Sequence, residues 1–148
     1  MRSALTLMLF GALLSPAAAQ ESRDVYGDWY TPEKDSIIRL ADCGDGTPCG
    51  TVIWIDKTRA KVLVDENNPD PALRERPMEG VTLLSGFAER GEDWRGGTIY
   101  NPEDGKSYDA RLKRMSEEEL QVKGCVGPFC KGMVWTAAGE PRGDAEEG

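Results

Sequence analysis

The sequence contains no histidine among its 148 residues. Histidine is the side chain that most often serves as a general base or a metal ligand near neutral pH. Its absence excludes a Ser-His-Asp or Cys-His catalytic device. Basic residues are in the minority as well, because 18 Lys and Arg face 26 Asp and Glu, giving a formal net charge of −8. Such a chain repels nucleic acid and anionic lipid surfaces, so we expect neither as a partner.

Long apolar stretches are also scarce. The main one runs from Leu5 to Leu14 after Arg2, and it is shorter than the roughly 20 residues of a membrane-spanning helix. Ala17-Ala18-Ala19 follows, with the small residues that signal peptidase requires. We therefore expect residues 1–19 to be a signal peptide of an exported protein without a membrane span. A retained membrane anchor is the alternative.

The four cysteines form two close pairs, Cys43 with Cys49 and Cys125 with Cys130. An even number of cysteines in an exported chain indicates disulfides, and four cysteines allow three pairings. We favour a bridge within each close pair, because short turn-rich loops bring their ends together at low entropic cost. A zinc site built from all four thiolates is the alternative, although the spacings are wider than the usual C-x2-C. We therefore expect no metal and no cofactor.

The stretch from Trp94 to Leu112 has the pattern of a β-hairpin. Tyr108, Ala110 and Leu112 alternate with polar residues, as in a strand with one buried and one solvated face. The residues from Pro102 to Gly105 (Pro-Glu-Asp-Gly) suit a tight turn, because proline presets φ and glycine accepts the left-handed position.

About eight or nine short strands, with turn signals every 8–12 residues or so, fit a barrel or a sandwich. The predicted strands include Lys61–Val64. Short connections favour up-and-down neighbours, and a closed barrel removes exposed sheet edges. We therefore predict an all-β fold, a small antiparallel up-and-down barrel of about eight strands over residues 20–137. One short helical segment is expected from Pro71 to Arg76, capped by Asp70. Residues 138–148 are predicted to form a disordered acidic tail.

Spaced Gly, Trp, Pro and Cys residues run through the chain from about Val25 to Trp135. They are Gly27-x-Trp29-x-x-Pro32, Cys43-Gly44 with Cys49-Gly50, Trp54, Asn68-Pro69-Asp70-Pro71-x-Leu73-Arg74, Gly80, Gly97-x-Ile99-Tyr100-Asn101-Pro102-x-x-Gly105-Lys106-x-Tyr108, and Gly124-Cys125 with Cys130 and Trp135. This combination resembles the bacterial exported family called domain of unknown function 2147 (DUF2147). The resemblance implies a periplasmic, lipocalin-like barrel, related in shape to carriers of small apolar molecules. It implies no catalytic residue.

Aromatic residues are the candidate ligand contacts, because they offer a large contact area with few polar demands. The candidate lining residues are Trp54, Trp94, Tyr100, Tyr108 and Trp135. Our first hypothesis is a monomeric binding module for a small apolar or amphipathic molecule, by analogy at the level of the fold. The same rings can instead fill the core, since an eight-stranded barrel is just wide enough to be filled by its own side chains.

Two other functions compete with ligand binding. A structural or protein-interaction role in the cell envelope would use the segment from Asn67 to Pro77, with its arginines, as a docking surface and would need no cavity. An enzyme is not expected, because the chain has no acid–base constellation of matched spacing. The groups that remain for catalysis are Asp28, Asp65, Asp104, Asp109, Lys106 and Tyr108.

Overall fold

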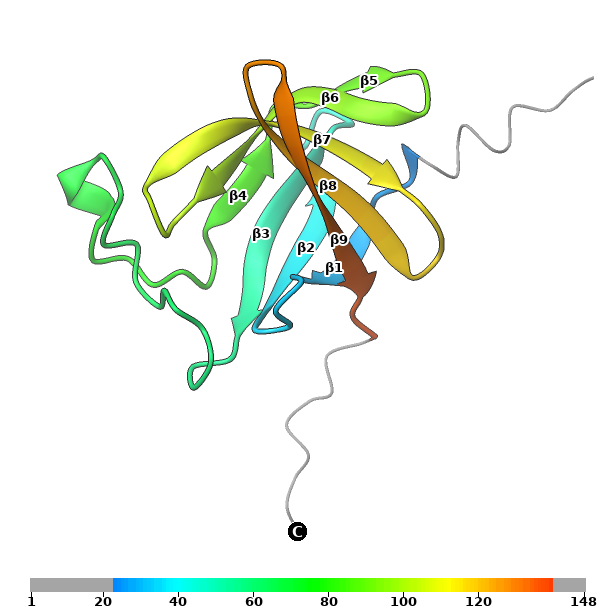
Figure 1. The fold of residues 1–148 in the computed structure, drawn as a ribbon. Helices are drawn as coiled ribbons and strands as arrows, with labels where there is room; N and C mark the ends of the chain where they lie inside the picture. Colours follow the sequence, from blue (N-terminus) through cyan, green and yellow to red (C-terminus); the bar gives the residue numbers. More distant parts are fainter. Residues whose placement is uncertain (1–22, 140–148) are drawn as a thin grey trace, which may run out of the picture.

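The computed structural model describes residues 23–139. The predicted signal peptide and most of the predicted acidic tail lie outside the described residues. The strands are β1 (Gly27–Tyr30), β2 (Ser36–Asp42), β3 (Pro48–Ile55), β4 (Thr82–Ser85), β5 (Ala88–Arg90), β6 (Asp93–Asn101), β7 (Lys106–Arg114), β8 (Glu119–Val126) and β9 (Phe129–Ala137) (Figure 1). Within residues 23–139, no helix has the length and hydrophobicity to cross a membrane.

Eight of these strands close into an antiparallel barrel in which chain neighbours are sheet neighbours. Strands β1 to β4 pair in order, β6 to β9 pair in order, and the pairs β1–β9 and β4–β6 close the ring. Strand β5 pairs with the first residues of β6, so it continues the edge of β4 beyond Gly86 and Phe87. The prediction of an up-and-down barrel of about eight strands is confirmed. Each strand of the ring finds a partner on both sides, which protects its backbone groups.

The predicted hairpin is formed by β6 and β7. Asn101 pairs with Lys106 across the turn, and the Gly105 N–H donates to the Asn101 carbonyl at 2.9 Å. Gly105 has a φ of +69°, which side-chain-bearing residues rarely adopt, and a Cβ there would lie 1.9 Å from the Asn67 carbonyl oxygen. Position 105 therefore requires glycine for two reasons. The backbone has a positive φ, and the long connection between β3 and β4 approaches too closely to leave room for a Cβ.

Two buried indoles close one end of the barrel, which we call the closed end. The Trp29 Nε1–H donates to the Val25 carbonyl at 3.0 Å, and the Trp94 Nε1–H donates to the Arg23 carbonyl at 2.7 Å. The Arg114 guanidinium lies 5.3 Å from the centroid of the Trp29 ring, within the range of a cation–π contact. The chain entering β1 is thus held over the barrel by side chains that strands β1, β6 and β7 contribute.

The prediction of a strand at Lys61–Val64 is wrong. These residues belong to the long β3–β4 connection (residues 56–81), where Val64 forms an isolated bridge with Pro77. The segment folds back on its own connection rather than adding to the barrel: the Met78 N–H donates to the Leu63 carbonyl at 3.0 Å. The barrel is already closed by β4 and β6, so no strand edge is offered to this segment.

The predicted helix is also shorter than expected. It is a single 3-10 turn, η1 (Pro71–Leu73), and Asp70 caps it as predicted by accepting the Ala72 N–H at 3.0 Å. The turn ends at Arg74, whose Nε–H donates to the Asn68 carbonyl at 2.8 Å. The arginines that would have continued the helix are thus used to fold the connection back on itself.

Both close cysteine pairs are disulfides, Cys43–Cys49 and Cys125–Cys130. The first bridges the β2–β3 turn and the second the β8–β9 turn. This confirms the favoured pairing and leaves no free thiol in the described part of the chain for a zinc site. Two disulfides indicate that the protein matures in an oxidising environment.

Candidate functional site

A cavity of about 680 Å³ lies inside the barrel and opens at the end opposite the two sealing indoles. Its apolar wall is built from side chains of β2, β3, β4, β6 and β9, namely Ile38, Val52, Ile55, Leu83, Ile99 and Met133. Met78 adds to this wall from the long β3–β4 connection. This volume is within the usual range of sites for small molecules, roughly 300–1,000 Å³. The barrel is therefore not filled by its own side chains.

Four connections surround the open end, because strands of alternating direction bring every second connection to the same end. They are β1–β2, the long β3–β4 connection, β6–β7 and β8–β9. Figure 1 shows the long connection projecting to one side of the barrel. The charged residues that line the cavity all come from this rim or from strand ends beside it, and they are Glu33, Asp35, Lys61, Glu103 and Lys131. An apolar interior is thus combined with a polar mouth.

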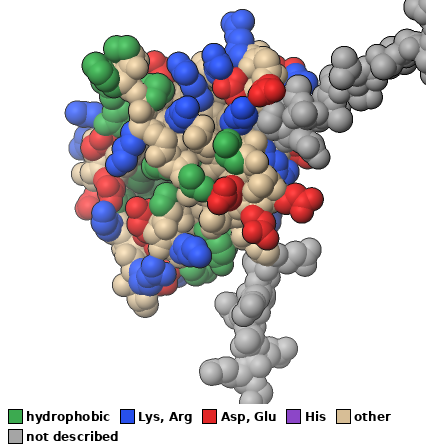
Figure 2. Space-filling view, turned by 45° about the vertical axis from the view of Figure 1, so that its right-hand side comes forward, with side chains coloured by type: hydrophobic (Ala, Val, Ile, Leu, Met, Phe, Trp, Pro, Cys, Tyr) green, Lys and Arg blue, Asp and Glu red, His purple; other side chains and the backbone are tan. Residues whose placement is uncertain are grey.

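The tip of the β8–β9 hairpin adds an apolar edge to this mouth. Val126 and Phe129 line the cavity opening and are 65% and 80% exposed. Hydrophobic side chains gather at the upper left of Figure 2, where this tip projects. The Cys125–Cys130 disulfide at the base of the turn holds the tip in place.

The structure brings together three of the five predicted aromatic residues. Tyr100, Tyr108 and Trp135 line the cavity. Trp94 is buried instead at the closed end, and Trp54 is 39% exposed on the outer surface, where it packs edge-to-face on Tyr30 with centroids 6.4 Å apart. The structure therefore places Trp54 and Trp94 away from the cavity.

A β-bulge explains the position of Trp54. Ile37 pairs with Trp54 but Ile38 pairs with Val52, so Ile53 is an extra residue in β3. A bulge shifts the alternation of side chains along a strand. Val52 and Ile55 consequently face inward while Trp54 faces outward. Strict alternation would have placed Val52 and Trp54 on the same face.

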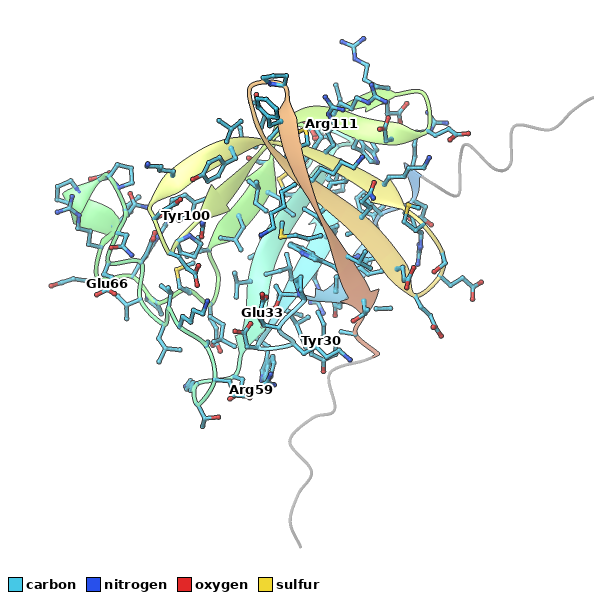
Figure 3. The ribbon with its side chains drawn as sticks, viewed as in Figure 1. Tyr30, Glu33, Arg59, Glu66, Tyr100 and Arg111 are labelled. Carbon is cyan, nitrogen blue, oxygen red and sulfur yellow. A yellow bond between two sulfur atoms is a disulfide. The ribbon has the colours of Figure 1, made fainter. Side chains whose placement is uncertain are left out.

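Tyr100 belongs to a hydrogen-bonded cluster around the fully buried Asp65. The Tyr100 hydroxyl donates to Asp65 Oδ1 at 2.5 Å. The Asn68 amide and the Arg76 guanidinium donate to Oδ2, at 2.8 Å from Asn68 Nδ2 and 2.9 Å from Arg76 Nε. In Figure 3, Tyr100 lies beside the long connection, with Glu66 further out on it. The cluster ties this connection to the wall of the barrel.

Hydrogen bonding keeps the cluster in one protonation state. Burial alone would raise the pKa of Asp65, but the hydrogen bonds from Tyr100, Asn68 and Arg76 outweigh it and lower that pKa. Burial and the hydrogen bond to Asp65 raise the pKa of Tyr100 to about 12. Near neutral pH Asp65 is a carboxylate and Tyr100 a neutral phenol. Asp65, which the sequence left as a candidate catalytic group, therefore anchors the long connection to the barrel wall.

Tyr108 is held in a similar way at the β6–β7 turn. Its hydroxyl donates to Asp104, which raises the pKa of Tyr108 and lowers the pKa of Asp104. Both tyrosine hydroxyls of the cavity thus already donate to a carboxylate, and their rings are fixed as parts of the wall.

Trp135 differs from these tyrosines. It is 3% exposed, and its Nε1 is the one buried side-chain nitrogen or oxygen in residues 23–139 that has no hydrogen-bond partner. Buried polar atoms are nearly always paired, so this indole is an exception among the buried side chains. Over the same residues, no group of three or more Cys, Asp or Glu is placed to hold a metal ion.

Comparisons with known proteins agree with this architecture. The chain is similar to the solved structure of protein HP1028 from the human pathogen Helicobacter pylori, described as belonging to the lipocalin family. The TM-score is 0.69 at 26% identity, over 80% of this chain and 86% of that one. No curated protein matches the sequence. The model of the family described as "Uncharacterized protein conserved in bacteria (DUF2147)" matches residues 27–137. That match spans the whole barrel, from β1 to the end of β9, and we conclude that the chain belongs to the DUF2147 family.

Proposed function

We propose that this protein is a monomeric periplasmic binding protein that holds one small, largely apolar molecule inside its barrel. The observation that carries the proposal is the cavity of about 680 Å³, with apolar walls and a polar mouth. Burial of apolar surface contributes roughly 25 cal/mol per Å², so a ligand with an extended apolar part gains most from this site. The structural similarity to a protein of the lipocalin family supports ligand binding inside the barrel, by analogy at the level of the fold.

The charges at the mouth favour a neutral ligand or one with a cationic head. The cavity lining includes three carboxylates, from Glu33, Asp35 and Glu103, but two amines, from Lys61 and Lys131. Lys61 is already paired with Glu103 at 3.2 Å. An anionic ligand would therefore meet net repulsion at the entrance, in addition to the repulsion by the acidic chain as a whole.

The periplasm is the compartment that best fits the sequence and the disulfides together. The short apolar run with Ala17-Ala18-Ala19 is typical of an export signal. Disulfides persist in oxidising compartments, of which the bacterial periplasm is one. This location would place the protein between two membranes, where carriers of apolar molecules are needed because such molecules dissolve poorly in water.

A protein-interaction role is the less favoured alternative. It predicts a filled barrel and a docking surface at residues 67–77. The arginines of that segment are engaged internally instead, Arg74 with the Asn68 carbonyl and Arg76 with Asp65. The segment therefore stabilises the open end through internal contacts. The cavity is then the main feature that the interaction role does not explain.

Two experiments test the proposal. The first is native mass spectrometry of mature protein purified from a bacterial periplasm, in which a mass released on denaturation identifies the bound class of molecule. The second is fluorescence titration with N-phenyl-1-naphthylamine, an apolar probe that brightens in apolar surroundings. We expect the wild-type protein to bind this probe in a 1:1 complex.

A matched pair of variants locates the binding site. Met133→Trp fills the cavity from its wall, whereas Val134→Trp adds the same side chain to the outer face, where Val134 is 48% exposed. We expect Met133→Trp to weaken probe binding at least about tenfold and Val134→Trp to change it less than about twofold, since only the first removes contact volume. Equal binding by both variants, or no binding by the wild-type protein, would count against the proposal.

A further inference from the structure

We propose that the β8–β9 turn docks this protein onto the surface of a phospholipid membrane, with the mouth of the cavity beside the point of contact. The contact is made by residues 126–129, which we call the docking tip, and by the cations behind them. Docking itself goes beyond the proposed function, because it needs no bound ligand. Its use, the exchange of an apolar ligand with the membrane, rests on that function.

The first observation is the composition and exposure of the docking tip. Its sequence is Val-Gly-Pro-Phe, which contains no polar side chain. Val126 and Phe129 are cross-strand partners, so their side chains lie on the same face, and they are 65% and 80% exposed. Single exposed apolar residues are ordinary on a protein surface, but here two neighbours stand together at a projecting end (Figure 1). Contact with acyl chains would remove both from water.

The second observation is that the docking tip is already ordered. The Cys125–Cys130 disulfide bridges its base, so docking costs little conformational entropy. Pro128 at the turn has no N–H group that would lose its hydration in the membrane interface. The tip can therefore enter the interface without rearrangement.

The third observation is the positive charge directly behind the docking tip. Lys123 and Lys131 flank the tip and its disulfide in the sequence, and Arg111 is the strand partner of Lys123. Among the described residues, none of these three cations forms an ion pair. Like charges directly opposite each other on a sheet are destabilising, so an anionic group beside Arg111 and Lys123 would relieve their repulsion.

The spacing of these charges matches the depth of a membrane interface. At roughly 3.3 Å per strand residue, Lys131 lies about 7 Å behind Phe129, and Lys123 about 10 Å behind Val126. Apolar faces of membrane-surface segments are buried by about 5–10 Å into the boundary between headgroups and acyl chains. The two lysines would then stand at the level of the headgroup phosphates.

Net charge alone predicts repulsion from anionic lipid, but the acidic groups near the docking tip are few or already paired. Asp109 is the strand partner of Cys125, and Glu103 on the neighbouring β6–β7 turn is paired with Lys61. In Figure 3, Glu33 lies far below the tip, which stands at the top of the view. Exposed charges further apart than about 8 Å are largely screened at physiological ionic strength. The charges at the tip therefore decide the interaction.

The position of the docking tip connects membrane contact with the cavity. Val126, Phe129 and Lys131 line the cavity opening. An apolar molecule could thus pass between membrane and cavity with little exposure to water. Two side chains bury less apolar surface than a myristoyl chain, which itself binds membranes with a constant of only about 10⁴ M⁻¹. Docking is therefore weak and reversible, as a protein that carries its ligand away requires.

Co-sedimentation with vesicles, with lipid titrated into the millimolar range, measures docking of the mature protein without ligand. Val126→Ser and Val134→Ser are a matched pair, because each replaces an exposed valine, one at the tip and one on the outer face of β9. We expect Val126→Ser to weaken binding to phosphatidylcholine vesicles about fivefold, Phe129→Ser at least about tenfold, and Val134→Ser less than about twofold. Phosphatidylglycerol in the vesicles should strengthen wild-type binding, and Lys123→Gln should reduce that gain about fivefold.

NMR on the wild-type protein locates the contact without any variant. With nanodiscs that contain spin-labelled lipid, the amide signals of Gly127 and Phe129 should broaden. The indole N–H signals of Trp29 and Trp94, at the closed end, should not. Equal broadening at both ends would overturn the inference, as would vesicle binding that neither Val126→Ser nor Phe129→Ser weakens.

The outcomes also separate docking from the proposed function. If the wild-type protein binds N-phenyl-1-naphthylamine in solution but no vesicles, the inference fails and the proposed function stands. Vesicle binding without probe binding would support docking and count against the proposed function. Dimerisation that Phe129→Ser abolishes, seen by analytical ultracentrifugation without any vesicle binding, would assign the tip to a second copy of the chain and overturn the inference.

Discussion

Replacement of Asp65 by Asn tests whether the buried cluster holds the long β3–β4 connection against the barrel. The carboxylate accepts hydrogen bonds from Tyr100, Asn68 and Arg76, and its own side chain is fully buried. An amide of the same shape can still accept from Tyr100, but its NH₂ group would face the donors of Asn68 and Arg76. The variant therefore loses an ion pair and places like groups in contact.

The expected loss of stability follows from these contacts. Removing one partner of a buried ion pair costs about 3–5 kcal/mol, because the other partner is left uncompensated. The Arg76 side chain is 37% exposed and can be hydrated after the loss, so the lower end applies, about 3 kcal/mol. For a domain of this size, that corresponds to a fall in Tm of about 10 °C. Glu66→Gln is the matched control, since Glu66 is the exposed neighbour on the same connection.

The pH dependence provides an independent check. The pKa of Asp65 is lowered in the folded state, so its contribution to stability is fully present above the unfolded pKa of about 3.9 and is lost as pH falls through the folded pKa. Thermal unfolding of Asp65→Asn and wild type, followed by circular dichroism, should differ most at neutral pH, and the difference should narrow as the pH falls below the unfolded pKa of about 3.9. A variant within about 0.5 kcal/mol of wild type at pH 7 would refute the reasoning, since that is the range of ordinary surface substitutions.

Two further changes test the connections at the open end. Gly105→Ala should cost more than 2 kcal/mol or so, because a Cβ would meet the Asn67 carbonyl at 1.9 Å, whereas Gly91→Ala, with a similar positive φ and nothing within 4 Å, should cost only about 1 kcal/mol. Urea denaturation measures both, and equal losses would show that the close approach contributes nothing. Replacing Cys125 and Cys130 together by Ser should lower the free energy of unfolding by about 2 kcal/mol, the loop-entropy value for so short a loop. The same titration on this variant and on wild-type protein, both without reductant, checks this, and an unchanged midpoint would contradict it.

Three buried tryptophans differ in the hydrogen bonding of their indole N–H groups. Trp29 and Trp94 use their indole N–H groups to hold the entering chain. Trp135 is buried as well, but its N–H has no hydrogen-bond partner, and other atoms of this residue line the cavity.

Local features of the sequence determined the elements of this fold. The β6–β7 hairpin follows from a period of two in side-chain character and from a turn whose glycine has a φ of +69°. The disulfide pairing follows from loops so short that their ends meet in any compact form. The up-and-down order follows from short connections between many short strands, since such strands pair with their chain neighbours.

Only the tertiary structure decided which side chains form the site. Trp54 faces outward because of a bulge in the pairing between β2 and β3. No residue pattern within β3 alone indicates this bulge. Trp94 and Trp135 are both buried strand residues, yet one seals an end and the other lines the cavity, since barrel closure sets their positions. The contact of Tyr100 with Asp65 joins residues 35 positions apart. Periodicity reports the environment of each residue along one strand, whereas a binding site depends on distances between strands, which arise only when the barrel closes.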